Sequence, residues 1–323
     1  MTAVGDHATQ LGWDRHWARW FADAPGDPAR VSRVDRGRLQ VVRLDGALAW
    51  LPAPTTGDMP VTGDWVSCDV VGGQPVLAAL ADRRTALVRR DPADVSQTRA
   101  RSPRPSGARP QTLAANMDRV WIVHSVDQPL RAGWLDRALV VAFGSGAQPT
   151  IVIAKADLGG ADDCASTVAT LAPTVPVTIS SAGTGLGIER LATHLHDGGC
   201  AALLGRSGSG KSSLINALAG VGTQRTAAVR TGDAKGRHTT TRRSLTLVPP
   251  GSVIDTPGVR ALGLWEPADG LALAFPDIAA LAVACRFADC SHRHEPGCAV
   301  HDRVDNGELD RQRYHRYITL CEQ

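Results

Sequence analysis

The stretch from residue 205 to residue 212 combines glycines, hydroxyls and one lysine at a spacing that suits phosphate binding. It has the sequence Gly-Arg-Ser-Gly-Ser-Gly-Lys-Ser, which matches the pattern GxxxxGK[ST]. The glycines let backbone N–H groups turn inward around an anion, Lys211 reaches the β- and γ-phosphates, and Ser212 offers its hydroxyl to Mg²⁺. The pattern predicts a nucleoside-phosphate site formed by Gly205, Arg206, Ser207, Gly208, Ser209, Gly210, Lys211, Ser212 and Ser213.

The residues around this loop predict the elements that position it. Residues 200–204 are apolar and short enough for a buried strand, and residues 213–218 are apolar at helical spacing before Gly220. A strand, a glycine loop and a helix in this order point the helix N-terminus at a phosphate. The alternative is a flexible Gly/Ser loop.

Two segments after the loop suit Mg²⁺ and the γ-phosphate. Asp255 begins the sequence Asp-Thr-Pro-Gly after an apolar strand, where it can hold the water shell of Mg²⁺ while the N–H of Gly258 senses the γ-phosphate. Between the two lies the polar run 236–241, in which Thr240 or Thr241 could join Mg²⁺ when a γ-phosphate is present. These segments favour a nucleoside triphosphate.

Two segments before the loop suit the recognition of guanine. A carboxylate at Asp157 accepts hydrogen bonds from N1–H and the 2-amino group of guanine, whereas adenine offers neither donor. In a dry pocket the unpaired carboxylate would cost about 1–3 kcal/mol. Lys155 would lay its aliphatic stem along the base plane. The candidate base-reading residues, each set at the end of an apolar strand, are Ala154, Lys155, Ala156 and Asp157, then Ser181 and Ala182.

A cluster of cysteine and histidine near the C-terminus has the spacing of a metal site. Three thiolates and one imidazole form a closed tetrahedral set that suits structural Zn²⁺ and leaves no open position for catalysis. The alternative is a group of unrelated free thiols. His294 competes with His292 for the fourth position, and the spacing alone does not choose between them. The candidate cluster consists of Cys285, Cys290 and Cys298 with either His292 or His294.

The hydrophobic pattern predicts the elements that carry these motifs. From residue 111 onward apolar strands alternate with amphipathic helices, which is typical of a mostly parallel α/β sheet covered on both faces. The predicted strands include 118–124, 150–154, 175–179, 244–248 and 252–254, and the helices 131–143, 162–171 and 187–195.

The first ninety residues have a different texture. Trp13, Trp17 and Trp20 would share one face of a helix, which favours docking against a neighbouring domain over a ligand or RNA platform. Short alternating runs then predict an OB-like β-barrel with Trp50 and Trp65 in its core, and such barrels often carry single-stranded nucleic acid.

Two arginine-rich stretches are candidates for RNA contact. Residues 81–110 contain eight arginines among prolines, so they form either a solvated linker or a contact with an RNA backbone. Residues 268–284 and 308–321 are predicted to be helical. The second of these segments carries a candidate RNA-facing set, Arg311, Arg313, His315 and Arg316.

Composition limits the class of protein. The chain has 323 residues, of which 43% are hydrophobic and 21% charged, as expected of a soluble protein of several domains. We expect it in the cytoplasm and off the membrane, because the sequence contains no apolar run of membrane length and no secretion signal. The net charge is only +3, so any contact with a polyanion must rest on local clusters.

The motifs occur in the order base-reading, base-reading, phosphate loop, switch I and switch II. In that order they resemble the ribosome small subunit-dependent GTPase A family, a circularly permuted group that acts in bacterial ribosome assembly. The resemblance extends to residues 62–66, 115–118 and 238–241 and to the cysteine cluster, where it selects His292. It implies a helical extension at 1–30, an OB-like barrel at 31–90, a basic linker at 91–110, a permuted P-loop GTPase domain at 111–264 and a helical zinc domain at 265–323.

The resemblance also implies an activity. It predicts a cytoplasmic, monomeric hydrolase that converts GTP to GDP with Mg²⁺, is stimulated by the 30S subunit in late maturation, and binds rRNA through the barrel and the zinc domain, which holds one Zn²⁺. One alternative is a nucleotide-gated RNA- or ribosome-binding factor with negligible turnover. A more distant one is a P-loop ATPase or kinase, which Asp157 and Ser181 disfavour.

Two departures from the family pattern bear on this activity. Ala154 stands where the family has Asn, whose amide ties the base pocket to the phosphate loop; its loss should weaken nucleotide binding by ~1 kcal/mol and preserve the preference for GTP over ATP. Val259 cannot orient water, so intrinsic hydrolysis should be slow. The candidate catalytic groups are Lys211, Gly258 and His238, and His238 could instead cap backbone or face RNA.

Overall fold

One large sheet runs through most of the molecule. The computed structural model describes residues 3–91, 109–223, 243–256 and 262–322. Six strands form the core of the sheet, with the first five parallel and the last antiparallel. In spatial order they are β10 (Val177–Ile179), β9 (Gln148–Ala154), β8 (Arg119–Ser125), β11 (Cys200–Gly205), β13 (Gly251–Asp255) and β12 (Ser244–Val248).

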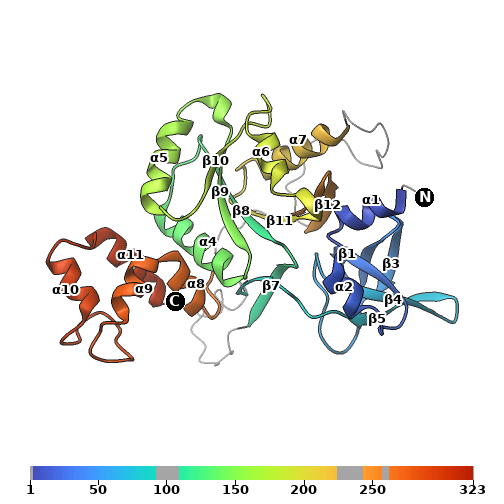
Figure 1. Ribbon diagram of the computed structural model, residues 1–323, viewed down its shortest axis with the longest axis horizontal. Helices are drawn as coiled ribbons and strands as arrows, with labels where there is room; N and C mark the ends of the chain where they lie inside the picture. Colours follow the sequence, from blue (N-terminus) through green and yellow to red (C-terminus); the bar gives the residue numbers. More distant parts are fainter. Residues whose placement is uncertain (1–2, 92–108, 224–242, 257–261, 323) are drawn as a thin grey trace, which may run out of the picture.

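Helices cover both faces of this sheet, as predicted (Figure 1). Val120 and Ile122 of β8 pack into the core beneath α4 and α5, whereas Trp121 and Val123 pack into the core beneath α6 and α7. Successive side chains of a strand point to opposite faces, so a strand that is buried on both sides has a continuous apolar sequence. The helices are α4 (Ala132–Gly144), α5 (Ala161–Leu171), α6 (Ile188–Thr193) and α7 (Lys211–Thr223), with short 3₁₀ turns η1 (Ala156–Leu158) and η2 (His196–Gly198).

The N-terminal strands continue the same sheet. Arg33 of β1 pairs with Ser244 of β12, and β1 lies between β2 and β4. In these five antiparallel strands β3 contacts β5, but no hydrogen-bonded ladder joins the two, so the structure shows the strands of the predicted barrel without its closure. The strands are β1 (Asp27–Asp35), β2 (Arg38–Arg43), β3 (Leu48–Pro52), β4 (Trp65–Val71) and β5 (Gln74–Leu80).

Residues at the end of the range predicted for the barrel form a separate two-stranded sheet. β6 (Ala86–Arg90) pairs with β7 (Pro110–Ala115), which are the strands on either side of residues 92–108. Two of the arginines nearby have structural roles: Arg83 forms an ion pair with the buried Asp64, and Arg84 forms one with Asp14. The central part of the predicted basic linker lies outside the described residues.

The tryptophans near the N-terminus form a docking face but do not share one helix, because Trp13 precedes α2 (Arg15–Trp20) and only Trp17 and Trp20 lie on it. α1 (Ala3–Gln10) and α2 are separated by a turn that contains Trp13. The rings of Trp13 and Trp17 lie 5.3 and 5.6 Å from that of the buried Trp65. The prediction of a core position was wrong for Trp50, which is 36% exposed and stacks under the guanidinium of Arg38 at 4.2 Å.

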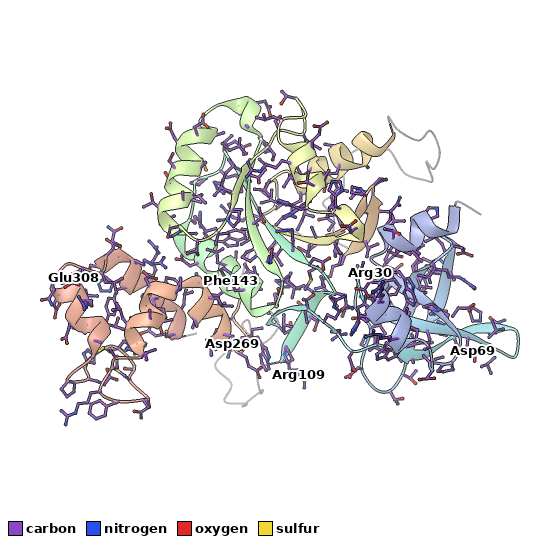
Figure 2. All side chains as sticks on the ribbon, viewed as in Figure 1. Arg30, Asp69, Arg109, Phe143, Asp269 and Glu308 are labelled. Atoms are coloured by element: carbon purple, nitrogen blue, oxygen red, sulfur yellow. The ribbon has the colours of Figure 1, made fainter. Side chains whose placement is uncertain are left out.

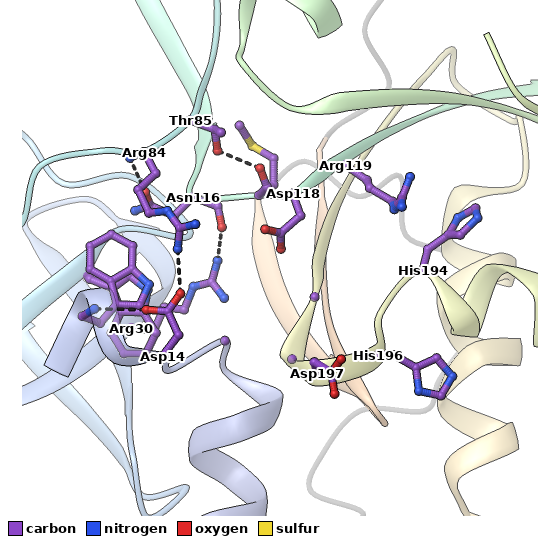
Figure 3. A pocket seen from close by; sticks show the side chains of 16 residues that line it. Asp14, Arg30, Arg84, Thr85, Asn116, Asp118, Arg119, His194, His196 and Asp197 are labelled. Carbon is purple, nitrogen blue, oxygen red and sulfur yellow. Dashed lines mark hydrogen bonds and ion pairs between the residues drawn. The ribbon is translucent and has the colours of Figure 1, made fainter.

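A buried arginine joins the N-terminal part to the large sheet (Figure 2). Arg30, 1% exposed, donates hydrogen bonds to the carbonyls of Leu11, Gly63 and Asn116. It lines a pocket of about 270 Å³ whose other wall includes Asp118 and residues near His194 (Figure 3). Because its acceptors lie after the end of α1, in the turn before β4 and in the connection between β7 and β8, one side chain fixes three segments together.

The C-terminal helices pack on α4 at the other end of the molecule (Figure 1). A Cβ at Gly270 would lie 2.2 Å from the carbonyl oxygen of Val140, so α8 approaches α4 as closely as only glycine permits. The predicted helix 268–284 is broken before Pro276. The elements are α8 (Ala268–Ala274), α9 (Pro276–Ala282), α10 (Ala299–Asp305) and α11 (Arg311–Cys321). Among the described helices, none combines the length and apolarity needed to cross a bilayer.

Two arginines predicted to face RNA are instead part of this packing. Arg313 forms an ion pair with Asp277 and donates to the carbonyl of Leu171, while Arg316 forms an ion pair with Asp136 at 3.0 Å. The prediction was wrong for these two because their ion-pair partners lie on helices that are remote in sequence, Asp277 on α9 and Asp136 on α4. Arg311 and His315 of the same helix are exposed.

The ion pair between Arg316 and Asp136 should make the stability of this packing depend on pH. Burial raises the pKa of Asp136 to about 6, against the opposing effect of Arg316, Arg313 and Arg137. A carboxyl group whose pKa is higher in the folded state binds more protons there, so its contribution to stability falls as pH rises through that pKa. We expect Arg316→Ala to raise this pKa further and to lower the free energy of unfolding by about 3 kcal/mol at pH 8, and by less at pH 6.

Chemical denaturation at the two pH values measures this difference. Arg311→Ala is the matched control, because its side chain on the same helix is 64% exposed and lies 3.5 Å from Asp305. An equal loss of stability at pH 6 and pH 8 in Arg316→Ala would contradict the assignment.

Candidate nucleotide site and metal centre

The phosphate loop lies at the carboxyl end of the parallel strands, between β11 and α7. Gly208 and Gly210 have φ angles of +79° and +95°, which favour glycine. A Cβ at Gly205 would lie 2.6 Å from the carbonyl oxygen of Val123 on β8. The loop therefore needs glycine at these three positions, and α7 begins at Lys211 within the motif, so its N-terminus points toward the loop.

Lys211 and Asp255 place opposite charges in the buried floor of this site. The ammonium of Lys211 donates to the carbonyls of Gly205 and Arg206 at 3.0 and 3.2 Å. Burial lowers the pKa of Lys211 and raises the pKa of Asp255, and each charge opposes the shift of the other. Ser212 donates a hydrogen bond to Asp255, and this also opposes the rise in its pKa.

The oxygens beside Lys211 fit a magnesium ion. Oδ1 of Asp255 is buried and has no hydrogen-bond partner among the described residues. A carboxylate and a hydroxyl oxygen are hard ligands of the kind that Mg²⁺ prefers, together with phosphate and water. Asp255 and Ser212 could therefore hold Mg²⁺ that arrives with a nucleotide.

The base-reading residues lie at the same edge of the sheet. Ser181, which follows β10, donates a hydrogen bond to the exposed carboxylate of Asp157. The ammonium of Lys155 lies 2.8 Å from the carboxylate of Asp127. A Cβ at Gly210 would lie 3.6 Å from Cβ of Ala154, so the end of β9 contacts the phosphate loop. The structure brings together the predicted base-reading segment, Ser181 with the adjoining Ala182, and the loop.

Residues after β8 also belong to this site, and sequence analysis missed them. Asp127 accepts a hydrogen bond from Ser125 and pairs with Lys155, and these contacts lower its pKa. Gln128 donates to the carbonyl of Ser207 at 3.1 Å. Two polar residues within the turn that follows an apolar strand of a parallel sheet are the signal that could have found them, because such strand ends meet at one edge.

Some predicted residues lie outside the part of the chain that the structure describes. These are His238, Thr240, Thr241 and Gly258, together with Val259.

The four predicted metal ligands form one cluster. Their donor atoms all lie within 4.8 Å of one another. Nδ1 of His292 lies 3.4 Å from Sγ of Cys285 and 3.6 Å from Sγ of Cys298. His294 is not part of the group, so the structure distinguishes the two histidines that the spacing could not. The cluster, completed by Cys290, could hold a metal ion.

Hydrogen bonds from residues outside the ligand set hold the loop that carries these ligands. The carboxylate of Glu295 accepts from the backbone N–H groups of Ser291, Arg293 and His294 at 2.8–3.1 Å. The hydroxyl of Tyr314 on α11 donates to the carbonyl of His292 at 2.8 Å. Such outer contacts orient metal ligands, and three thiols with one imidazole are a donor set typical of structural Zn²⁺.

Comparison with known proteins places the chain in a family. A family model described as RsgA GTPase matches residues 82–265, more than half of the chain. The protein "Small ribosomal subunit biogenesis GTPase RsgA" of Streptomyces coelicolor is 41% identical over 99% of this chain and 88% of its own length. This chain belongs to the RsgA GTPase family. The protein of the same name from Streptomyces avermitilis is 42% identical over 96% of this chain and 83% of its own length.

Solved structures agree with the family assignment. YjeQ from Thermotoga maritima matches with a TM-score of 0.62 at 26% identity, over 91% of this chain and 96% of its own. YloQ, described as a circularly permuted GTPase, matches with a TM-score of 0.61 at 25% identity, over 91% and 93%. The predicted permutation is confirmed, since β8, β9 and β10 precede the phosphate loop. As a member of this family the chain is a GTPase.

The two neighbouring histidines provide a matched test of the metal cluster. We expect His292→Ala to lose bound zinc and to unfold at a lower temperature, because a closed four-ligand site contributes directly to folding. His294→Ala should keep the metal content of the parent chain, as it lies outside the cluster. Elemental analysis of both purified variants measures this, and equal zinc content in the two would contradict the ligand set.

Proposed function

We propose that this chain hydrolyses GTP in response to the 30S ribosomal subunit and acts in the late maturation of that subunit. The observation that carries the proposal is the meeting of the phosphate loop, Asp255 and Asp157 at one sheet edge. Its support is the 41% identity, over 99% of the chain, to a protein named for small ribosomal subunit biogenesis. We further propose a cytoplasmic monomer.

The residues of the site have distinct parts in this reaction. Lys211 would exchange the carbonyls of Gly205 and Arg206 for the β- and γ-phosphates, and Ser212 and Asp255 would hold Mg²⁺. Mg²⁺ supplies charge neutralisation on the phosphate oxygens when bound. Asp157, oriented by Ser181, would accept the two donors at the edge of guanine. The remaining residues of the phosphate loop would contribute backbone N–H groups around the phosphates.

Partner contacts are proposed for the two ends of the molecule. We propose that the N-terminal strands close into an OB-like barrel and that the domains have the boundaries predicted from the sequence. The exposed stack of Trp50 and Arg38 offers a π face and a cation, a combination that suits a nucleobase and its phosphate. At the other end the Cys₃His cluster would hold one Zn²⁺, and Arg311 and His315 remain exposed for rRNA.

Hydrolysis of GTP and of ATP, each with and without purified 30S subunits, tests the proposal. We expect slow GTP turnover alone, a large increase with subunits, and no comparable increase with ATP. Lys211→Ala is the negative control and should lose turnover by about a hundredfold or more, since it removes charge that stabilises the transferred phosphate. Turnover of ATP would indicate the distant alternative, a P-loop ATPase or kinase.

Two observations favour a second function, that of a nucleotide-gated ribosome- or RNA-binding factor. Ala154 presents a buried methyl group to the phosphate loop where the family pattern has an amide, and Val259 offers no group to orient water. Under this alternative, the GTP-bound chain binds 30S subunits, but the subunits do not increase its rate of GTP hydrolysis. The same assay distinguishes the two functions.

His238 is the candidate for orienting the attacking water when a partner orders its segment. We expect His238→Ala to reduce subunit-stimulated turnover by about 10²-fold, the size typical of a lost general base, and to leave GTP affinity within about twofold. Unchanged stimulated turnover would assign His238 to backbone capping or RNA contact.

A further inference from the structure

At Ala154 the nucleotide site lacks a side-chain hydrogen bond between the base-reading segment and the phosphate loop. Its methyl group is buried at the end of β9 and lies beside Gly210 of the phosphate loop. A methyl group forms no hydrogen bond, so this position cannot hold the base-reading segment to the loop as an amide would. Something else must fix the distance between the two halves of the site if both are to bind one nucleotide.

The turn after β8 contacts both halves with consecutive side chains. Asp127 pairs with Lys155 in the base-reading segment at 2.8 Å. Gln128 donates to the carbonyl of Ser207 in the phosphate loop at 3.1 Å. The amide nitrogen of Gln128 also lies 3.3 Å from the place where a Cβ on Gly208 would be, so it rests directly against the loop.

The turn itself is held firmly enough to act as a connector. The backbone N–H of Gln128 donates to the carbonyl of Ser125 at 3.0 Å, and the hydroxyl of Ser125 donates to Asp127. The N–H of Val126 donates to the carbonyl of Ala154 at 3.2 Å. Ser125 and Ala154 are register partners in the parallel pair β8–β9. The turn is therefore hydrogen-bonded to the backbone of Ala154, the residue that has no side-chain amide.

We propose that Asp127 and Gln128 are positioning residues that connect the guanine-reading segment to the phosphate loop, the connection that Ala154 cannot make. Asp127 fixes the ammonium of Lys155, whose stem would lie along the base. Gln128 fixes the carbonyl of Ser207 and with it the loop. Their effect is on the affinity for GDP and GTP, because both nucleotides span the two halves. The inference rests on the proposed nucleotide site.

Equilibrium binding of GDP and GTP to the full chain, without ribosomal subunits, tests this role. We expect Gln128→Ala to weaken both by about 3–10-fold, the equivalent of one net hydrogen bond. Asp127→Ala should weaken both by about 2–5-fold, since its ion pair is partly exposed. Thermal unfolding of the nucleotide-free variants should match that of the parent, so that a loss of affinity reports on the site and not on the fold.

Gln148→Ala is the matched control, an exposed glutamine at the start of β9 and so at the opposite edge of the sheet. It should bind both nucleotides as the parent does. If Gln128→Ala and Asp127→Ala also bind as the parent does, the proposal is wrong. A parent chain that binds neither nucleotide would instead overturn the proposed function, and that result is obtained before any variant is compared.

A double-mutant cycle shows whether the turn stands in for the missing amide. Ala154→Asn places an amide next to Gly210, so it should restore most of the affinity lost in Gln128→Ala while improving the parent by less than about twofold. Coupling of this kind is expected only where two groups serve one connection. Equal improvement of the parent and of Gln128→Ala would show that the two positions act independently. That result would overturn the inference that the turn replaces the missing amide.

Discussion

Burial of the central sheet on both faces is the constraint on which the rest of the structure depends. β8 and β11 each supply side chains to the cores on both sides, so their interior positions must all be apolar. Polar groups that do chemistry can then lie only where strands end. Because the strands are parallel, the ends of β8, β9, β11 and β13 meet at one edge, and the nucleotide site is assembled there.

The same constraint gives a structural role to the opposite edge of the sheet, where the parallel strands begin. There the carboxylate of Asp118 accepts from the N–H of Cys200, and the carbonyl of the nearby Asn116 accepts from Arg30. A guanidinium buried among carbonyls is stable only while all of its acceptors remain in place. The N-terminal part of the molecule is thus fixed at the edge away from the nucleotide, and β12, which pairs with both β13 and β1, is the strand that joins the two regions.

The C-terminal helices use charge for packing more than their sequence suggests. Arg313 covers the ring of Phe275 at 4.7 Å and pairs with Asp277, and Arg316 reaches a carboxylate that is 3% exposed. Arginine suits such positions because its stem packs like an apolar chain while its head pairs with carboxylates. The exposed residues of α11 are therefore available to a partner, whereas its other basic residues are used in packing.

The sequence by itself determined the phosphate loop, the members of the metal cluster, the permuted order of the motifs and the parallel sheet. The loop and the cysteine cluster follow from the spacing of residues along a short stretch, where backbone geometry converts sequence distance into spatial distance. The sheet follows from the alternation of apolar strands and helices, and the permutation from the order of the motifs. Only the tertiary structure decided the contact of Gln128 with Ser207, the burial of Arg313 and Arg316 and the exposure of Trp50. These depend on which remote segments become neighbours, and that is set by the packing of all elements together, which no local pattern of side chains contains.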